Sequence, residues 1–505
     1  MRRLPLLPLL LLAACAPEGD SAGPGGLVLG ARVLDGTGSP PALLDVRWEG
    51  DRITELGDLE PRRGEVVVDG AGLFLAPGFI DTHSHHDRGL PEEPEARGAV
   101  SQGITTIVVG QDGGSPHPLG PWLDALEQAP VAVNVAAYTG HNTLRERVLG
   151  DDWRRAATPD EVEGMSALLR ADLAAGALGL STGLEYDPGI YAHPDEVLAL
   201  ARITAEEGGR YISHLRSEDR TLDAALEELI EIGRQTGMPV QVSHMKLAMK
   251  GLWGQAGRVL ERLERARAEG IDVTADVYPY TFWQSTMTVL LTERDFTDRT
   301  AFAYALDEMV PPEGMIVARY APDPSVEGAT LAEVAERWGT DPVDAYMRLV
   351  AGREEARAAG RDASESVLAT SMDPEDVDAL LRWPHSNVSS DGALAGAHPR
   401  GWGAFPRVLA AVRERDLMSW EQAVHRMTGL AAAHMGFPDR GVLRPGAIAD
   451  LVLFDPETVT DRATTADPHR PADGIVQVWV AGRTVWQGGA ATGERPGRVL
   501  RRPAR

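Results

Sequence analysis

The sequence is short of cysteine and of positive charge, and each shortage narrows what the protein can be. Its 505 residues include one cysteine, Cys15, so no disulfide can form within the chain. It has 49 basic residues against 75 acidic ones, a formal net charge of −26. This balance argues against a nucleic-acid partner, which needs a clustered basic surface. Hydrophobic residues at 43% still give an ordinary globular composition.

Lysine is almost absent. All but two of the 49 basic residues are arginine, and the lysines are Lys246 and Lys250. A genome bias towards arginine codons explains the skew. Against that bias, two lysines four residues apart suggest that arginine does not suffice at one of these positions.

Long hydrophobic runs are also missing after the first residues of the chain. The one apolar run near the start, Leu4–Leu12, follows two arginines and is too short to span a bilayer, which is typical of a signal peptide. Residues Leu12–Cys15 resemble the bacterial lipobox, in which the cysteine is lipidated and becomes the mature first residue. The simpler alternative is a coincidental cysteine in an ordinary signal peptide.

We therefore expect residues 1–15 to be a lipoprotein signal peptide with lipidation at Cys15, and residues 16–26 to be a flexible tether. The body would lie in the bacterial cell envelope, outside the cytoplasm, held to a membrane by the lipid alone. Ala16 after the cysteine favours the outer membrane, with the body on the periplasmic face.

The pattern of strands and helices predicts an α/β protein with two folded parts. Short apolar runs with tight turns at 27–72 and again at 441–490 indicate a small β-sandwich built from both chain ends. Between them, residues 73–440 alternate strands and helices, which favours a (β/α)8 TIM-like barrel; a doubly wound open sheet is the alternative. Residues 290–380 read mostly as helix, and we expect an insertion there that forms a lid before the last barrel strand. The eight strand candidates are Leu73–Ile80, Ile104–Gly110, Val131–Tyr138, Ala177–Thr182, Arg210–His214, Pro239–His244, Ile271–Tyr278 and Asn387–Asp391.

Potential metal ligands stand at the carboxyl ends of several predicted strands. Two histidines spaced as His-x-His at a strand end lie on one face and can bind one divalent ion. Taken singly, each residue has an ordinary explanation, such as a surface histidine or an Asp-Gly turn. A barrel brings all these strand ends to one site, so together they predict a metal centre. The residues are His83 and His85 after strand one, Asp112 after strand two, His214 after strand five, His244 after strand six and Asp391 after strand eight.

The short stretches around these residues resemble motifs of the amidohydrolase superfamily. The four that do so are Pro77–His85, Ser213–His214, Ser243–His244 and Ser390–Gly392. The finer likeness is to the N-acyl-D-amino-acid deacylases, or D-aminoacylases, and it spans residues 27–490. The stretches that carry this likeness are Ser101–Thr106, Tyr211–Glu218, Pro239–Lys246, Asp276–Tyr280, His398–Arg400, Phe405–Leu409 and Asp439–Pro456.

The resemblance assigns metal ligands. It implies that His214 and His244 hold a catalytic Zn²⁺ and that His83 and His85 line a second metal position. Characterised deacylases commonly have a cysteine after the second strand, where this chain has Asp112. A carboxylate is a harder ligand than a thiolate. This difference leaves open whether the site binds one divalent ion or two.

The resemblance also implies how the substrate is held and cleaved. A divalent ion lowers the pKa of a bound water to about 7, and Asp391 would accept its proton and then protonate the departing nitrogen. Lys246, two residues past His244, faces the same side of its strand. By resemblance it would pair with the substrate α-carboxylate, with Tyr278 donating a hydrogen bond and Arg400 nearby.

We therefore expect metal-dependent hydrolysis of an amide in a small carboxylate-bearing molecule, with an N-acyl-D-amino acid as the favoured substrate. The alternatives are a dipeptidase, a cyclic amidase of the hydantoinase or dihydroorotase kind, or a binding lipoprotein without catalysis. The last is disfavoured because neither a metal ligand nor the general base is missing. No nucleic acid is expected, and the membrane is a partner only through the lipid anchor.

Overall fold

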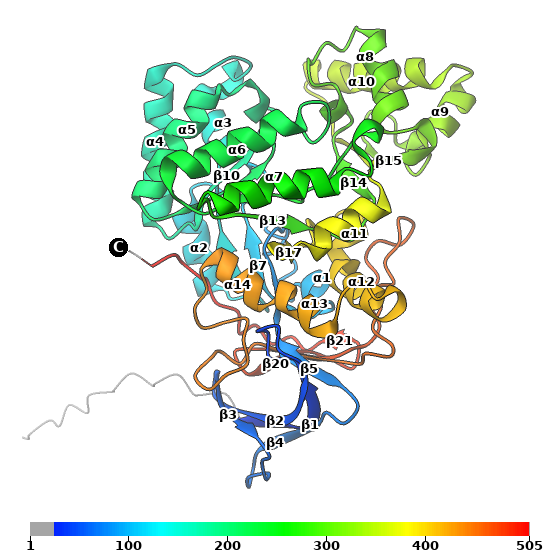
Figure 1. The fold of residues 1–505 in the computed structure, drawn as a ribbon. Coiled ribbons are helices and arrows are strands. Elements are labelled where there is room, and N and C mark those ends of the chain that lie inside the picture. Colours follow the sequence, from blue (N-terminus) through cyan, green and yellow to red (C-terminus); the bar gives the residue numbers. More distant parts are fainter. Residues whose placement is uncertain (1–24, 504–505) are drawn as a thin grey trace, which may run out of the picture.

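The computed structural model describes residues 25–503, so Cys15 and the predicted signal peptide lie outside the described residues. Figure 1 shows three regions: a sheet made from both chain ends at the bottom, a barrel in the middle and a lobe at the upper right. Within residues 25–503, no helix is both long enough and apolar enough to cross a bilayer.

The barrel is built from parallel strands at the eight expected positions. Parallel pairing runs from β6 to β8 and from β9 to β17, and Tyr138 alone separates β8 from β9. The ring closes between its first and last strands, where Asp391 N donates to His83 O and His85 N donates to Gly392 O, both at 2.8 Å. The strands are β6 (Phe79–Asp81), β7 (Ile104–Val109), β8 (Asn134–Ala137), β9 (Thr139–Gly140), β10 (Gly179–Gly183), β11 (Arg210–His214), β12 (Val240–Val242), β13 (Val273–Val277) and β17 (Ser386–Val388).

Amphipathic helices cover the outside of this ring. In α6 (Leu222–Thr236), for example, Leu222, Leu226, Leu229 and Gly233 are buried at helical spacing, so one stripe of the helix packs inward. The other helices around the barrel are α1 (Arg97–Val100), α2 (Leu119–Gln128), α3 (His141–Leu149), α4 (Pro159–Ala174), α5 (Pro194–Glu206), α7 (Ala256–Ala268), α11 (Pro374–Arg382), α12 (Arg400–Arg415), α13 (Trp420–Met427) and α14 (Gly429–Met435).

Strands from the two ends of the chain form one nine-stranded sheet, in the region where we expected one small sandwich built from both ends. Antiparallel pairing of β5 with β18 joins the two ends. The sheet encloses a shared core in which the rings of Trp48 and Trp479 meet edge to face at 5.6 Å. The strands are β1 (Gly26–Val33), β2 (Ala42–Glu49), β3 (Arg52–Gly57), β4 (Val66–Asp69), β5 (Phe74–Pro77), β18 (Leu451–Phe454), β19 (Ile475–Val480), β20 (Arg483–Gln487) and β21 (Ala490–Ala491).

The segment expected as the first barrel strand, Leu73–Ile80, is divided between the two parts of the fold. Its first half is β5 of the terminal sheet, and its second half is β6 of the barrel. The division falls at Gly78, where a side chain would lie 2.2 Å from the side chain of Thr105. Only glycine allows the backbone to pass that close to its neighbour while it changes sheets.

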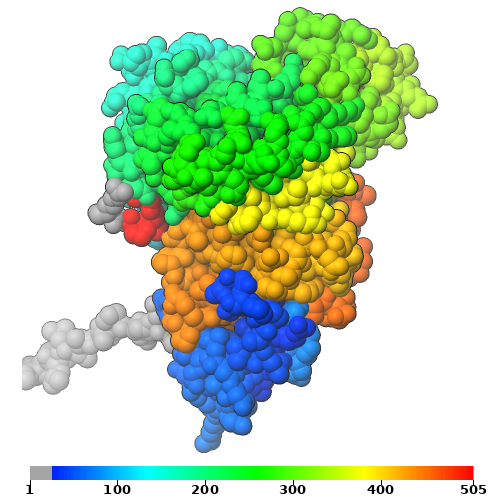
Figure 2. Space-filling view, in the orientation of Figure 1, coloured from blue at the N-terminus to red at the C-terminus, as the bar shows by residue number. Residues whose placement is uncertain are grey.

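The insertion differs from the mostly helical segment expected at residues 290–380. It begins with β14 (Phe282–Ser285), which forms an antiparallel sheet with β15 (Met315–Tyr320) and β16 (Glu365–Thr370). Its helices are α8 (Arg299–Tyr304), α9 (Leu331–Trp338) and α10 (Pro342–Ala358). Helix α11, which we had included in it, packs on α7, β13 and β17 of the barrel. The insertion is the green lobe at the upper right of Figure 2.

Candidate active site

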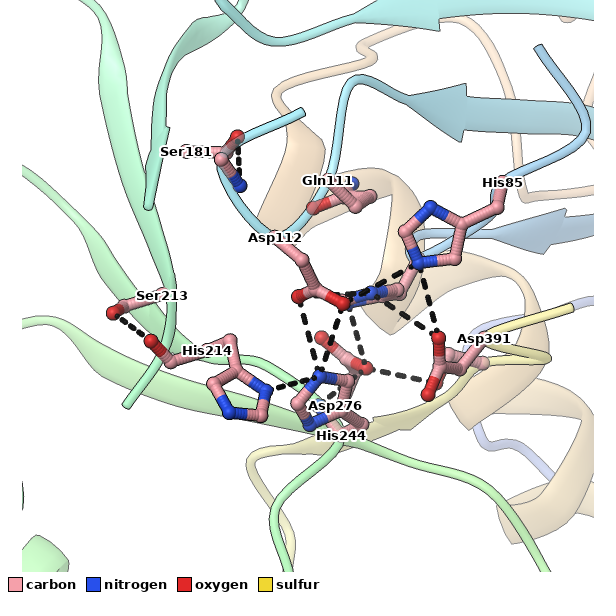
Figure 3. Close-up of polar contacts among 12 residues, drawn as sticks. His85, Gln111, Asp112, Ser181, Ser213, His214, His244, Asp276 and Asp391 are labelled. Atoms are coloured by element: carbon pink, nitrogen blue, oxygen red, sulfur yellow. Dashed lines mark hydrogen bonds and ion pairs between the residues drawn. The ribbon is translucent and has the colours of Figure 1, made fainter. Parts of the chain in front are cut away.

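Three of the predicted ligands and the predicted general base meet at the carboxyl end of the barrel. Figure 3 shows His85, Asp112, His244 and Asp391 pointing towards one another. Nε2 of His85 lies 3.3 Å from Asp112 Oδ2 and 3.2 Å from Asp391 Oδ1. Nε2 of His244 lies 3.2 Å from Asp112 Oδ1. The loop after β7 therefore places one carboxylate between two histidines from opposite sides of the barrel.

Within residues 25–503, two of the three groups of donor atoms gathered within 4.8 Å contain Asp112, and the third joins His214 with Glu185 and Glu218. Of the two that contain Asp112, one joins it with His83, His85 and Asp391, and the other joins it with His214 and His244. The structure thus brings together all six residues that the sequence placed at strand ends. Their roles as ligands or base remain predictions.

Unsatisfied buried atoms show that this donor set fits a cation. His83 is fully buried, and its ring nitrogens lie 3.4 Å from Asp112 Oδ1 and 3.5 Å from Asp276 Oδ1 without a well-formed hydrogen bond to any described residue. Oδ1 of Asp391 is likewise buried without one. Polar atoms left in this way are costly unless something else satisfies them. Imidazole and carboxylate together suit a divalent ion such as Zn²⁺.

The backbone is strained at three site residues. Asp112, His244 and Asp391 have φ of 54°, 32° and 49°, in the left-handed region, and they are three of the seven non-glycine residues with positive φ in the described chain. Such conformations persist only where surrounding contacts hold them, and they cluster at functional sites. Here Asp276 Oδ1 accepts a hydrogen bond from His244 N at 2.9 Å. The hydrogen bond from Asp391 N to His83 O, which closes the barrel, holds the backbone of Asp391.

A cationic wall flanks the carboxylates. Nζ of Lys246 donates to both carboxylate oxygens of Glu218, at 2.7 and 2.8 Å, and lies 2.7 Å from His244 Nδ1. Arg400 Nη1 forms an ion pair with Asp391 Oδ2 at 2.7 Å. The ring of Tyr278 lies beside both cations, and its buried hydroxyl has no hydrogen-bond partner in residues 25–503. The three residues predicted to hold a substrate carboxylate are therefore neighbours.

Comparison with known proteins identifies the family. A sequence model of the amidohydrolase family matches residues 66–486. The chain belongs to the amidohydrolase family.

Related amidohydrolases of known activity match nearly the whole chain. N-acyl-D-aspartate deacylase of Alcaligenes xylosoxydans xylosoxydans is 39% identical, over 94% of this chain and 94% of its own. D-aminoacylase of the same organism is 36% identical, over 95% of this chain and 98% of its own. A crystal structure of N-acyl-D-glutamate deacylase from Bordetella bronchiseptica, with zinc and a phosphonate mimic of the tetrahedral intermediate, superposes with a TM-score of 0.83 at 37% identity, covering 94% of this chain and 99% of that one.

Opposite charges set the protonation of the amidohydrolase site in the absence of metal. Burial raises the pKa of Asp112, but His244 and His83 hold it well below its usual value. Burial lowers the pKa of His83, but Asp112 and Asp276 raise it well above the usual value. The carboxylate is thus ionised and the imidazole protonated at neutral pH, so an entering cation must displace protons.

Supporting carboxylates, Asp276 and Glu218 among them, escaped the sequence prediction. Asp276, at the end of β13, lies 3.5 Å from His83 Nδ1 and also accepts from Ser389 Oγ at 2.8 Å. Glu218, in the loop after β11, pairs with Lys246 and approaches His244 Nδ1 at 3.1 Å. Carboxylates behind histidine ligands fix the orientation and tautomer of the ring. A buried lysine needs a carboxylate partner. This requirement is the one clue from which a carboxylate near Lys246, such as Glu218, could have been predicted.

The site opens to solvent through a mouth of about 650 Å³. His85, Asp112 and Asp391 line its floor, and residues 284–286 of the insertion line its wall. The predicted ligands are therefore accessible from the side that the insertion borders.

Proposed function

We propose that the protein is a metal-dependent deacylase that hydrolyses the amide bond of N-acyl-D-amino acids. The observation that carries the proposal is the convergence of two histidine-carboxylate groups on Asp112, beside buried cations able to hold a carboxylate. The three relatives named above, each matched over nearly its full length, are deacylases or aminoacylases of D-amino acids by name.

The metal would be held by the residues that the sequence predicted. We propose that His214, His244 and Asp112 hold one ion and that His83 and His85 contribute to a second position, also with Asp112. Zinc is the favoured identity, because the Bordetella enzyme was crystallised with zinc and the donors suit it. When bound, such an ion polarises the amide carbonyl and activates water.

The protein's own groups then handle the proton and the substrate. Asp391 takes a proton from the attacking water and passes it to the amide nitrogen as the C–N bond breaks, giving a carboxylic acid and a free amino acid. Burial raises the pKa of Asp391, but Arg400 and His244 lower it below its usual value, so the carboxylate starts ionised. Lys246, Tyr278 and Arg400 hold the substrate carboxylate. When Arg400 turns to the substrate, its hold on Asp391 weakens, and Asp391 becomes a better proton acceptor.

A substrate screen tests the proposal. Zinc-loaded protein is offered paired N-acetyl-D- and N-acetyl-L-amino acids, dipeptides and hydantoins, and release of free amino groups is measured. We expect turnover of N-acetyl-D-amino acids that Asp391→Asn lowers by a factor of about 10² to 10⁴, the contribution typical of general acid–base catalysis. Turnover confined to dipeptides or hydantoins would overturn the assigned substrate, and equal activity of Asp391→Asn would overturn the mechanism.

We also propose that Cys15 anchors the protein by lipid to the periplasmic face of the outer membrane. The support is the sequence alone: a short signal peptide, the lipobox-like Leu12–Cys15 and Ala16 after it. Expression in a bacterium with two membranes and metabolic labelling with a fatty acid test this. We expect label on the wild type in the outer-membrane fraction and none on Cys15→Ala; an unlabelled wild type contradicts the proposal.

A further inference from the structure

A small second pocket lies beside Lys246 and borders the open mouth, with which it shares Tyr186, Gln284, Ser285, Asp391 and Arg400. Its volume is about 30 Å³, room for two or three water-sized groups. Lys246, Arg400 and Asp391 form its inner edge. If Lys246 and Arg400 hold the substrate carboxylate, this pocket is the space beside the α-carbon for its side chain, and the larger mouth is left for the acyl group.

The outer wall of this pocket is apolar and comes from the insertion. It consists of Trp283 on β14, Val289 and Leu290 in the 3-10 turn Met287–Leu290, and Met309 at the end of the π-helical turn Ala305–Met309. All four are less than 8% exposed. An apolar side chain placed here would remove its own surface from water, which favours binding by about 25 cal/mol per Å² of surface buried.

The charged groups of the pocket have no capacity for a second carboxylate. Its two cations are Lys246, already paired with Glu218, and Arg400, already paired with Asp391, and both would serve the α-carboxylate. The other ionisable groups at its edge include the carboxylates of Glu185, Glu218 and Asp219. An acidic side chain would face these without a free cation, and burying an unpaired charge is costly.

The same carboxylates are also poor partners for a basic side chain, because each already has a donor. Glu185 Oε2 lies 3.0 Å from His214 Nε2, and Asp219 accepts from Ser217 Oγ at 2.6 Å. Glu218 is taken by Lys246. The ion pairs and hydrogen bonds thus leave no charged group of the pocket free, and the apolar wall is available to an apolar side chain.

We propose that this pocket selects N-acyl-D-amino acids with small or medium apolar side chains, such as leucine, valine or methionine, over N-acyl-D-glutamate and N-acyl-D-aspartate. The inference rests on the proposed function, because it assumes that the amide at the metal belongs to an N-acyl amino acid. Overall identity does not decide the matter, since relatives named for acidic substrates and for D-amino acids in general match this chain almost equally.

The test compares kcat/KM of the zinc-loaded full chain for the N-acetyl derivatives of D-leucine, D-methionine, D-glutamate, D-aspartate and D-lysine. We expect the apolar pair to exceed the acidic pair at least tenfold. A preference for D-glutamate or D-aspartate, or for D-lysine, overturns the inference and leaves the deacylase function standing. No turnover of any N-acetyl-D-amino acid overturns both.

Met309→Lys tests the wall itself, because lysine has an unbranched chain like methionine and brings a cation to the pocket. We expect it to raise the D-glutamate to D-leucine ratio of kcat/KM at least tenfold, while the matched variant Met309→Leu changes that ratio less than about threefold. A Met309→Lys protein that folds, keeps its zinc and has the wild-type ratio contradicts the inference. If Met309→Lys does not fold, the wild-type substrate ratio decides.

Discussion

Asp112 is the single residue shared by the donor group of His83 and His85 and that of His214 and His244, and it is also the residue where the chain departs from the cysteine that we expected in relatives. A carboxylate can bridge two ions, and its loss leaves His214 and His244 facing His83 and His85 without a negative charge between them. We therefore expect the metal content of the site to depend on this side chain more than on any one histidine.

We predict that Asp112→Ala lowers the affinity for zinc more than tenfold and reduces the number of ions retained after dialysis, measured by atomic emission. Asp112→Cys keeps a ligand but a softer one, so it should hold zinc and shift preference away from harder ions such as Mn²⁺. Asp195→Ala, at an exposed position, is the control. Equal metal content in Asp112→Ala and Asp195→Ala would show that Asp112 is not a ligand.

Lys246 is buried, and its ammonium fits between Glu218 and His244. We predict that Lys246→Arg raises KM for the N-acyl amino acid at least tenfold and leaves the zinc content unchanged. The planar guanidinium would pair side-on with Glu218 and have too little room to present a second face to the substrate. Unchanged kinetics, measured beside Lys250→Arg as the control, would exclude the carboxylate-binding role.

The convergence of the predicted ligands was foreseeable from the sequence because each follows a recognisable strand, and a barrel gathers strand ends by its geometry. Asp276 and Glu218 were not assigned, although both lie in stretches that carried the resemblance. Their function depends on the direction of a side chain within a loop or strand end, and spacing along the chain does not give that direction.

At the level of strands and helices, the order of barrel units followed from periodicity, but the insertion did not. Its strands β15 and β16 contain the apolar runs Met315–Val317 and Val367–Ala369, flanked by long helices that dominate the pattern. Likewise, Pro77-Gly78 interrupts an apolar run that otherwise reads as one strand. Which sheet a short apolar strand joins depends on distant partners, and local pattern cannot show them.

Glu365, on β16, ties the insertion's sheet to the pocket wall, since it accepts from Met287 N at 2.9 Å and its side chain is 2% exposed. Burial raises its pKa to about 7, although the Met287 N–H and Arg353 pull it down. The folded state thus binds a proton that the unfolded state has released. The stability contributed by protonated Glu365 is present below its usual pKa and is lost as pH rises towards 7.

We predict that the free energy of unfolding of the wild-type protein falls by up to about 3 kcal/mol between pH 4.5 and 7.5 because of this one residue. Glu365→Gln, which resembles the protonated form, should remove that part of the pH dependence; Glu336→Gln, at an exposed site on α9, should not. Thermal unfolding across this pH range measures both. Parallel pH profiles for the wild type and Glu365→Gln would contradict the assignment.

Across the whole molecule, one hydrophobic core runs from the barrel into the terminal sheet. The ring of Phe74 on β5 lies 5.6 Å from that of Phe454 on β18, and Phe454 lies 6.4 Å from Phe79 on β6. Val478 of β19 belongs to the same core. In Figure 2 the blue surface of the N-terminal strands lies directly against the orange surface, the colour of helices α13 and α14 in Figure 1. The pairing of chain ends was foreseeable, but this continuity with the barrel core was not.

Because the core is continuous, damage to the terminal sheet should destabilise the active site. Val478 is fully buried and Val476, two residues earlier on the same strand, is 37% exposed, so the two valines form a matched pair. We predict that Val478→Ala lowers the free energy of unfolding by about 2–3 kcal/mol, through lost burial and a cavity. Val476→Ala should cost less than about 0.5 kcal/mol.

The decisive comparison is between the temperature at which the protein unfolds and the temperature at which it loses activity. Scanning calorimetry of Val478→Ala should show one transition moved to lower temperature, and the temperature of half-inactivation of the deacylase should move with it. A barrel that keeps its activity through a separate, earlier melting of the terminal sheet would mean that the two parts fold independently. The sheet would then be a separate domain, because melting it would leave the residues around Asp112 in place.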